Sequence, residues 1–579
     1  MRLAATQPRA LPIAVTLGFV VAGAVAGLVV ATGNLVLIAL VMGAVAGIVL
    51  LNALPLAVWL LLVGIFLING PVAYFMPGLA RISWLFSLLG VFMTGAALLY
   101  AAVGRKRPAY PMPRFVYLSL AFVALVFVSA FFSNGSLEEI AAGAKRQFQF
   151  WGVMFLLAVV PFSTTTVRRW LLLLLGFALL QLPFSMYQRV VLMPQVMGWD
   201  VPGFVPFDII VGTFEGSMRG GGASAIMAMY LVLAAVGLYC AYRERLLGTA
   251  SFVVLLAVVL VPLGIGETKV VLMLIPVAMF FAFKDYILAR PLLFLGGMIV
   301  SLVVIAALGY LYFMVQVMGE GGVTWEESLE ATLAYNVGEK GYYGTGVNRL
   351  TAIPYWFQSQ SWAEPLRALF GYGLGSSFGV DGRVPLVGHV FLAHEGMHID
   401  LVSLSLLLWD FGFVGAALFV AILLAATATA GRCLKQARSS WDRTLCRILL
   451  ASLGTTFLML FYSASIVILV SHSFIVMFTL GLVAWRARNG PLPDDGSRVA
   501  QAMPSMPRAR ARGPAFVFTP PAGSAAAFSA RPARFDPGIA RAEARRPAPD
   551  SRVAPTTGQE LGPRDSRGRI EPVIDSSTP

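Results

Sequence analysis

Three of the chain's four histidines stand close together, at His389, His394 and His398. They belong to a polar stretch, rich in glycine and arginine, that separates two long hydrophobic stretches. A histidine titrates near neutral pH, so its imidazole can take or orient the proton of a hydroxyl group. We therefore expect the chemistry of this protein in the loop of residues 315–401, with His398 as the first candidate for a catalytic base and His394 as the second.

The same residues offer an alternative, because His394-Glu395-x-x-His398 matches the pattern H-E-x-x-H. On a helix this spacing puts two zinc ligands on one face and makes the glutamate a general base, as in a membrane-embedded zinc metalloprotease. Gly396 weakens a helix at this point, and no obvious third ligand stands out beyond His389, Asp400 or Asp410. In the alternative in which a histidine acts as the base, Glu395 or Asp400 would fix the tautomer of its imidazole.

Two cations stand where a polar segment meets a hydrophobic one. Arg219 lies in the glycine-rich segment 212–222, where a turn can bring backbone N–H groups and a positive charge to an anion. Lys269 opens a predicted helix, whose N-terminal backbone donors add attraction for a phosphate. The non-functional alternatives are that segment 212–222 is a flexible connector and that Lys269 simply extends its side chain to the membrane surface. We expect both cations to bind an anion.

The elements that must position these residues are hydrophobic helices. Of the 579 residues, 58% are hydrophobic and only 12% are charged, and the mean hydropathy is +0.80, which excludes a soluble domain of this size. The sequence predicts an all-α polytopic membrane protein with about 12 to 14 transmembrane helices, the lower number if residues 35–69 form a re-entrant hairpin, and with a large, partly helical loop. The predicted spans are residues 11–31, 35–53, 54–69, 82–103, 115–132, 148–161, 170–187, 223–242, 252–266, 270–283, 291–314, 402–428, 449–468 and 471–485.

The distribution of lysine and arginine predicts the orientation, because cationic residues are retained in the cytoplasm. Basic clusters fall in alternate loops and place both termini in the cytoplasm, so that the loop 315–401 lies on the outer, periplasm-like face of the membrane. The net charge of +14 follows from this topology, and we expect no nucleic-acid partner. All three cysteines fall on the predicted cytoplasmic side, at Cys240, Cys433 and Cys446. No disulfide framework is therefore implied.

The composition also divides the chain into two parts. Residues 1–488 hold the predicted spans, whereas residues 489–579 are rich in Pro, Ala, Arg, Ser and Gly and carry few large hydrophobic side chains. Such a segment cannot bury enough surface to fold, so it is expected to be a disordered cytoplasmic tail.

Several short motifs, in a consistent order over residues 211–430, resemble those of the bacterial O-antigen ligase and O-antigen polymerase family. The family carries an Arg followed by aromatic residues, then a glycine-rich stretch, a His-containing element and an acid-x-Gly-x-x-Gly turn that enters the next span. Lys269 stands where the family usually has Arg, and His398 stands about one helical turn farther from Gly412 than the family pattern. The matching segments are Gly212-Thr213-Phe214, Thr268-Lys269, Arg349, 355–357, 369–375, 398–400 and 410–415.

The resemblance implies a GT-C-like, metal-independent inverting glycosyltransferase that needs no cofactor. Its donor would be a glycan on undecaprenyl diphosphate, and its acceptor a glycan or lipid A-core hydroxyl. Without a metal, fixed cations must neutralise the departing diphosphate, so Arg349, Arg219 and Lys269 are expected to bind it and Arg349 to assist catalysis. The site would be supported by the glycines of the run 371–375, which are Gly371, Gly373 and Gly375.

This interpretation leaves several points open. The family includes O-antigen ligases of lipopolysaccharide biosynthesis and polymerases of exopolysaccharide biosynthesis, and the size of the loop and tail favours a polymerase. Both would act in the cell envelope with the lipid bilayer around them, and chain-length and export proteins of the polysaccharide are expected partners. A third class, a polysaccharide or lipid transporter, should show charged residues within its spans. Most ionisable residues here lie at span ends.

Overall fold

A computed structural model describes residues 35–103, 109–131, 135–199, 206–218, 220, 222–266, 268–292, 295–297, 299, 303, 347–360, 363–379, 387–394 and 396–493. The chain divides into two units, Met1–Pro504 and Ser505–Pro579, and all the described residues belong to the first. The predicted span 11–31, most of the span 291–314, residues 315–346 of the loop and nearly all of the predicted tail lie outside the described residues. So do Arg219 and Glu395.

Helices make up most of the described chain, and no strand occurs within the described ranges. They have the following bounds: α2 Leu35–Asn52, α3 Leu54–Val63, η1 Gly64–Asn69, α4 Gly70–Phe75, η2 Pro77–Ile82, α5 Ser83–Val103, α6 Arg114–Phe131, α7 Leu137–Phe148, α8 Trp151–Val159, α9 Thr164–Tyr187, η3 Gln188–Leu192, α10 Met193–Val196, η4 Pro206–Ile209, α11 Ala223–Arg243, α12 Thr249–Ile265, α13 Val271–Ala289, α16 Ala352–Ser359, α17 Pro365–Phe370, α18 His389–Ala393, α19 Ser403–Gln436, α20 Ser440–Tyr462, α21 Ser465–Ile468 and α22 Val470–Asn489.

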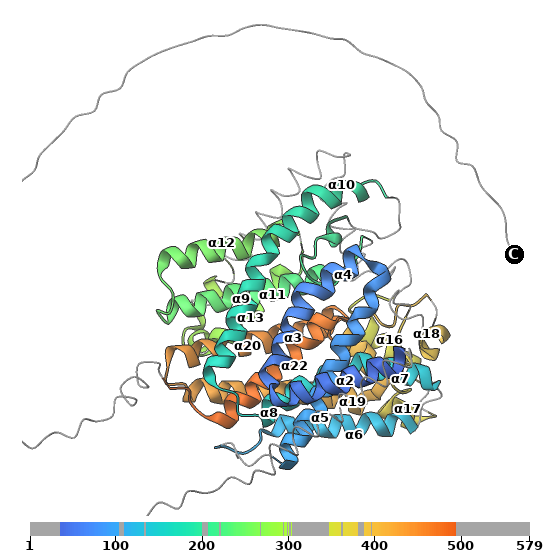
Figure 1. Ribbon diagram of the computed structural model, residues 1–579. Helices are drawn as coiled ribbons and strands as arrows, with labels where there is room; N and C mark the ends of the chain where they lie inside the picture. Colours follow the sequence, from blue (N-terminus) through green and yellow to red (C-terminus); the bar gives the residue numbers. More distant parts are fainter. Residues whose placement is uncertain are drawn as a thin grey trace, which may run out of the picture. The chain divides into compact units, whose positions relative to one another are not determined.

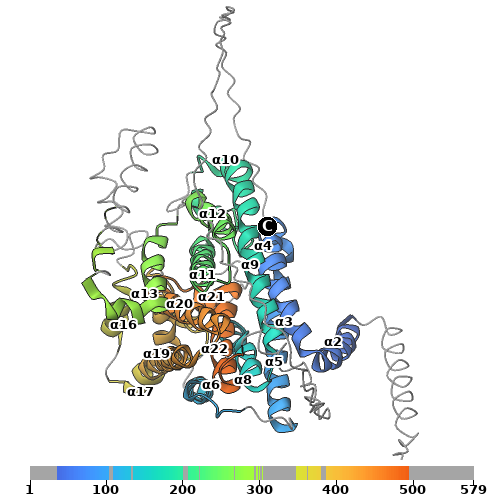
Figure 2. The ribbon, with the colours of Figure 1, turned by 90° about the vertical axis from the view of Figure 1, so that its left-hand side faces the viewer.

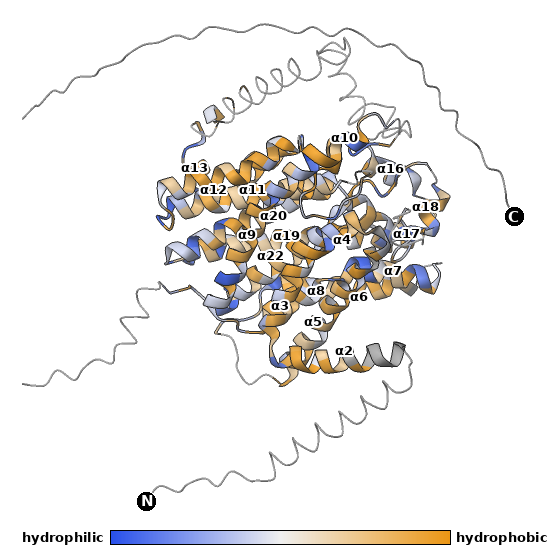
Figure 3. Cartoon of the chain, turned by 45° about the horizontal axis from the view of Figure 1, so that its top comes forward, coloured by the Kyte–Doolittle hydropathy of each residue, from blue (hydrophilic) through white to orange (hydrophobic). Residues whose placement is uncertain are grey.

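The prediction of an all-α multi-pass membrane protein is confirmed at this level. Eight helical segments among the described residues are long and apolar enough to cross a membrane, and hydrophobic residues dominate these helices in Figure 3. Shorter apolar helices accompany them, so the count of 12 to 14 spans stays a prediction. The eight segments are Leu54–Phe75, Ser83–Val103, Thr164–Val196, Ala223–Arg243, Val271–Ala289, Ser403–Gln436, Ser440–Tyr462 and Val470–Asn489.

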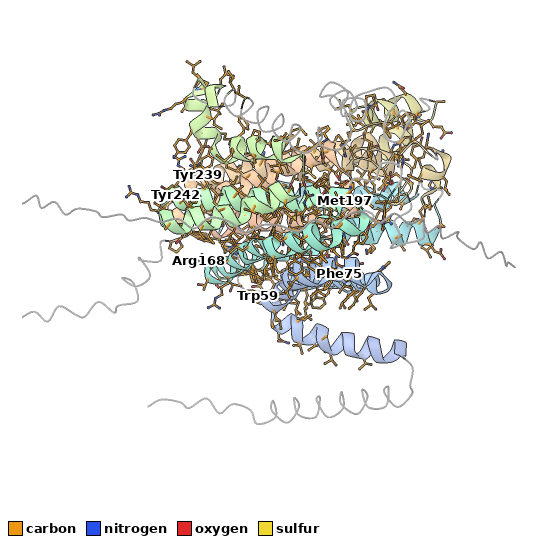
Figure 4. All side chains as sticks on the ribbon, turned by 90° about the horizontal axis from the view of Figure 1, so that it is seen from above. Trp59, Phe75, Arg168, Met197, Tyr239 and Tyr242 are labelled. Carbon is orange, nitrogen blue, oxygen red and sulfur yellow. The ribbon has the colours of Figure 1, made fainter. Side chains whose placement is uncertain are left out.

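Helices differ strongly in how deeply they are buried. In the most hydrophobic 18-residue stretch of α22, 94% of the residues are buried, whereas the corresponding share in α13 is only 22%. Both views in Figures 1 and 2 show α20 beside α13 and α22, with which it packs. Apolar side chains also remain exposed at helix ends, such as Phe75 and Met197, which Figure 4 labels. Exposed apolar side chains on long helices are what a lipid environment permits.

The segment predicted as the span 148–161 forms a shorter helix than expected. Helix α8 covers only Trp151–Val159, which corresponds to a rise of about 14 Å, well short of a bilayer. An amphipathic helix, α7, comes directly before it and was not expected. Ser136 caps α7 by accepting a hydrogen bond from the Glu139 backbone N–H, and acidic residues in the first turn and basic residues in the last complement the helix dipole.

Two segments of wide π-helix interrupt the regular helices. One is η1, which ends at Asn69 and continues from α3 into α4; the other is η3, which begins at Gln188 and continues from α9. The break that the sequence predicted between the spans 35–53 and 54–69 is confirmed, because α2 ends at Asn52 and α3 begins at Leu54. Both π-segments become important for the site, because each directs a buried polar side chain toward it.

A buried ion pair joins α20 to α22. Asp442 and Arg486 are both fully buried, and the guanidinium makes two hydrogen bonds to the carboxylate, at 2.5 and 2.6 Å. The backbone N–H of Leu492 also donates to Asp442, so the pair holds the end of α22 as well. An ion pair without solvent around it tolerates the loss of one partner poorly, because the other charge then remains buried alone.

We predict that Arg486→Met lowers the free energy of unfolding by roughly 3–5 kcal/mol, because it leaves the Asp442 carboxylate buried without its partner. The thermal midpoint of the purified protein in detergent, followed by tryptophan fluorescence, measures this change. Arg367→Met is the matched control, since the Arg367–Glu364 pair is exposed and contributes little. Equal midpoints for the two variants would contradict the role of the buried pair.

Candidate functional site

Two of the predicted anion-binding cations lie around one carboxyl group, that of Asp208 in η4. Burial raises the pKa of Asp208 above its ordinary value, while a hydrogen bond from Ser224 Oγ at 3.4 Å and the positive charges of Arg349 and Lys269 lower it. The Arg349 guanidinium also lies over the ring of Tyr462, 4.5 Å from its centroid. The structure therefore brings together Lys269 and Arg349, which are 80 residues apart in the chain.

The backbone beside this cation group is held by two buried glutamines of the preceding helix. Gln188 accepts hydrogen bonds from the backbone N–H groups of Val211 and Gly212 and donates to the Gly212 carbonyl. Gln181 accepts from the Thr213 N–H and donates to the Thr213 hydroxyl. Gly212 has a φ of +61°, and a Cβ there would lie 2.0 Å from the Gln181 side chain. This turn is therefore fixed in place, unlike a flexible connector.

Glu215 extends the same turn into the helical core. Its side chain is almost fully buried and accepts hydrogen bonds from the Asn69 side chain and from the backbone N–H groups of Val470 and Ser471. A carboxylate at the start of α22 satisfies N–H groups that have no partner within the helix and complements the helix dipole. The segment 211–217 is thus a rigid support. Arg219, two residues beyond it, lies outside the described residues.

A second charged group surrounds Asp400, close to the predicted catalytic His398. Burial raises the pKa of the Asp400 carboxyl, whereas electrostatic interactions with His398 and Arg146 and a hydrogen bond from the Gly379 N–H at 3.3 Å lower it. Arg146 comes from α7 and lies over the ring of Phe378, 4.2 Å from its centroid. Asp400 therefore interacts electrostatically with both His398, which the sequence singled out, and Arg146 of α7.

His398 itself has an unusual backbone, with a φ of +44°. A residue with a Cβ in this left-handed region costs on the order of 1 kcal/mol, and such residues occur often at functional sites. The neighbouring Ile399 carbonyl accepts a hydrogen bond from Ser405 in α19, and Ile399 is buried. The surrounding contacts therefore hold His398 at the end of the loop, immediately before α19.

His394 lies in a different environment from His398. Its Nδ1 is 2.9 Å from the Tyr355 hydroxyl, and its ring centroid is 4.9 Å from that of Trp409. Burial lowers the pKa of His394, so its imidazole is neutral at neutral pH. A neutral ring packed against aromatic side chains is suited to holding Tyr355 and α16 in place.

The H-E-x-x-H pattern does not form a helix over the described residues 389–394 and 396–400. Helix α18 ends at Ala393, and Gly396 and His398 both have positive φ values. The zinc-protease alternative required both histidines on one helical face, and this geometry is absent here. No group of three potential metal-binding side chains occurs among the described residues, which do not include Glu395.

The predicted glycine run packs against α19 at Asp410 and Gly412, where Gly412 interrupts the helix with a φ of +66°. A Cβ on Gly371 would lie 2.4 Å from the Asp410 backbone, and the backbone N–H of Gly373 donates to the Asp410 carbonyl. The Asp410 carboxylate accepts from the N–H of Gly375 and from Ser376 and Ser377. The two motifs therefore form one backbone unit. All three glycines have positive φ values, which glycine adopts without strain.

Helix α7 packs against this unit and completes the site. Gly375 approaches α7 so closely that a Cβ would lie 2.6 Å from the Glu139 carbonyl oxygen. The Glu139 side chain pairs with His389 Nδ1 at 2.8 Å. Sequence reasoning missed α7 and with it Glu139 and Arg146, although Ser136-x-x-Glu139 matches a capping box. It also missed Asp208, for which the only signal was an acidic residue within a short apolar stretch.

We predict that Gly375→Ala lowers the free energy of unfolding by about 2–3 kcal/mol, because the new Cβ meets the α7 backbone and φ is +85°. Gly396→Ala is the matched control, since its φ is +83° but a Cβ there meets open space. Thermal midpoints of the two purified variants give the comparison. A loss of stability in the control as large as that in Gly375→Ala would show that close packing on α7 is unimportant.

Comparison with known proteins assigns this chain to no family. A scan against protein-family models finds no match, and a search of curated proteins finds no significantly similar sequence. The resemblance to O-antigen ligases and polymerases therefore rests on the short motifs alone, and the function must be argued from the geometry of the two charged groups.

Proposed function

We propose that this protein transfers or polymerises a glycan from an undecaprenyl diphosphate carrier onto an acceptor hydroxyl, as a metal-independent inverting glycosyltransferase. The observation that carries the proposal is the convergence of Lys269 and Arg349 on one partly buried position, next to the ends of apolar helices. Two fixed cations suit a dianionic diphosphate, and arginine can bind it with a planar, bidentate fork. The apolar helices would accommodate the polyprenyl chain.

The proposed reaction is a single displacement at the anomeric carbon. The acceptor oxygen forms a bond to this carbon and loses its proton to His398, while the bond to the carrier breaks and undecaprenyl diphosphate leaves with the electron pair. The charge that grows on the leaving oxygen is stabilised by Lys269, Arg349 and Arg219. Asp400 beside His398 stabilises the imidazolium that forms.

The location follows the topology expected from the sequence. In this proposal the protein lies in a bacterial inner membrane with 12 to 14 spans in a GT-C-like arrangement, both termini in the cytoplasm and the loop on the periplasmic face. The acceptor is a growing glycan or a lipid A-core, so the protein acts as a polymerase or a ligase in exopolysaccharide or lipopolysaccharide biosynthesis. Chain-length and export proteins would be its partners. A polymerase is the preferred choice because the polar loop is large.

We predict that Arg349→Ala lowers kcat/KM for glycan transfer by at least about 100-fold, because one of the cations facing the diphosphate is lost. Arg349→Lys should retain part of the activity, since the charge remains and the fork does not. Transfer from a lipid-linked donor in proteoliposomes measures the effect. Arg367→Ala serves as the control, because Arg367 lies on the exposed side of α17.

The glycan profile of cells that carry Arg349→Ala distinguishes the two activities. Loss of long chains from lipopolysaccharide, with carrier-linked polymer still present, identifies a ligase, and loss of a secreted or capsular polymer identifies a polymerase. Wild-type yield and chain length in a correctly inserted Arg349→Ala protein would refute the proposed function.

We predict that His398→Ala lowers kcat by about 100- to 10,000-fold with little change in the donor KM, as expected for loss of a general base. His394→Ala should have a smaller effect, because His394 contacts Tyr355 and Trp409. A chelator should leave the wild-type rate unchanged. A larger loss in His394→Ala than in His398→Ala would make His394 the general base. Inhibition by the chelator, with recovery of activity when zinc is added, would favour a zinc enzyme.

A further inference from the structure

Helices α11, α13 and α20 pack on one another and carry basic and aromatic side chains at the ends that lie away from the candidate site. Helix α13 begins just after Lys269, in the candidate site, whereas Tyr286 lies near its other end. This separation corresponds to about 25 Å along a helix, which approaches the thickness of the hydrocarbon core of a bilayer. The reaction proposed above gives this second end no role. Its arginine–aromatic group consists of Arg243 of α11, Phe283 and Tyr286 of α13, and Arg447 of α20.

Both guanidinium groups of the arginine–aromatic group lie over the same two rings. Arg243 Cζ is 4.6 Å from the ring centroid of Tyr286 and 5.3 Å from that of Phe283. Arg447 Cζ is 5.0 Å from the centroid of Tyr286 and 4.8 Å from that of Phe283. Because both lie within 5.0 Å of the Tyr286 centroid, the two cations are at most twice that distance apart. Cation–π attraction to the shared rings offsets part of their mutual repulsion.

The two arginines differ in how the protein holds them. Arg447 is buried, and its Nη1 donates a hydrogen bond of 2.9 Å to the Ala282 carbonyl. This carbonyl lies directly before Phe283, where α13 departs from helical geometry. Arg243 is exposed and makes no hydrogen bond to another residue of the described chain. A guanidinium that stacks by its face keeps its N–H donors in its plane, so the donors of Arg243 are available to a ligand.

The acidic side chains nearby do not balance the charge of these arginines. Asp285 lies 3.8 Å from Arg447 Nη2, and its own side chain is 49% exposed. Glu244 follows Arg243 in the chain, but its carboxylate pairs with Arg443 at 2.7 Å. Within the described residues, one partly solvated carboxylate therefore stands near two arginines. The arginine–aromatic group keeps a positive charge that favours an anionic ligand.

Exposed apolar side chains beside this group indicate that the ligand is a lipid. Tyr286 is 50% exposed and Leu288 is 71% exposed, and only 22% of the residues in the most hydrophobic stretch of α13 are buried. Tyrosine at a membrane surface lies at the level of the lipid head groups, and basic side chains between transmembrane helices bind lipid phosphates.

We propose that the arginine–aromatic group binds the phosphate of an anionic phospholipid. Arg243 and Arg447 donate hydrogen bonds to the phosphate oxygens, Tyr286 holds both guanidinium groups in place, and the acyl chains lie along the exposed face of α13. The proposal goes beyond glycan transfer and does not depend on it, because no residue of this group takes part in the proposed reaction.

Native mass spectrometry of the full chain in detergent tests the proposal, because it resolves each bound lipid. The probes are phosphatidylglycerol, whose head group carries one negative charge, and phosphatidylcholine with the same acyl chains, whose head group is neutral overall. We expect the natural chain to bind phosphatidylglycerol at least roughly fivefold more tightly, the factor that one basic side chain near the membrane surface contributes. Equal affinities for the two lipids overturn the proposal.

The decisive variant is Arg243→Ala, because Arg243 is exposed and its loss leaves the hydrogen bond between Arg447 and α13 in place. We expect its preference for phosphatidylglycerol to fall by roughly fivefold. Arg290→Ala is the matched control, since Arg290 is an exposed cation at the same end of α13 but lies over no ring of the described chain. An equal loss of preference in Arg290→Ala would reveal diffuse attraction to positive charge and overturn the site.

Two further measurements complete the test. Excess glycerol 3-phosphate should not displace phosphatidylglycerol, because it has no acyl chains; displacement would identify a soluble phosphate ester as the ligand and overturn the assignment to a lipid. Thermal midpoints without added lipid show whether the variants fold. If Arg243→Ala does not fold, Tyr286→Leu decides, because it removes the ring that orients both guanidinium groups. An unchanged preference in Tyr286→Leu then overturns the proposal.

Discussion

The cost of removing charge from water governs this structure. Next to helices suited to a hydrocarbon environment, an ion must be paired, hydrogen-bonded or kept for binding a ligand. Asp442 and Arg486 satisfy this constraint with each other, and Glu215 satisfies it with three N–H donors. The charges around Asp208 are arranged differently, because two cations act on one carboxyl group. The interaction of both Lys269 and Arg349 with this one carboxyl group is the physical basis for proposing an anionic ligand there.

The long apolar runs were sufficient to predict the class of fold but not the contacts between distant segments. Long apolar runs predict helices because a membrane-spanning segment must satisfy its own backbone hydrogen bonds, and this local rule needs no tertiary information. Lys269 was recognisable because a cation at the start of an apolar run is conspicuous, whereas Arg349 was singled out only by the short motif that resembles the family. Asp208 and Arg146 gain their meaning only from neighbours far away in the chain, which the sequence alone does not reveal.

The histidine motif shows how backbone conformation decides between two interpretations of the same letters. His394 and His398 would share a helical face if residues 394–398 were helical, but positive φ values at Gly396 and His398 turn the chain instead. The two imidazoles consequently lie in separate environments, one packed against Trp409 and the other beside Asp400. The glycine run was recognised for its pattern, whereas its close packing on Asp410 and α7 depends on tertiary structure.

The two π-helical segments give the support of the site a dependence on exact spacing. A π-turn is equivalent to one extra residue in an α-helix, so removal of one residue lets the segment close into a regular α-helix and shifts the direction of side chains within it by up to about 100°. Such a deletion in η1 or η3 would turn Asn69 away from Glu215 or Gln188 away from Gly212. Homologues that keep this architecture should therefore preserve the number of residues in both segments more strictly than the apolar side chains that face lipid.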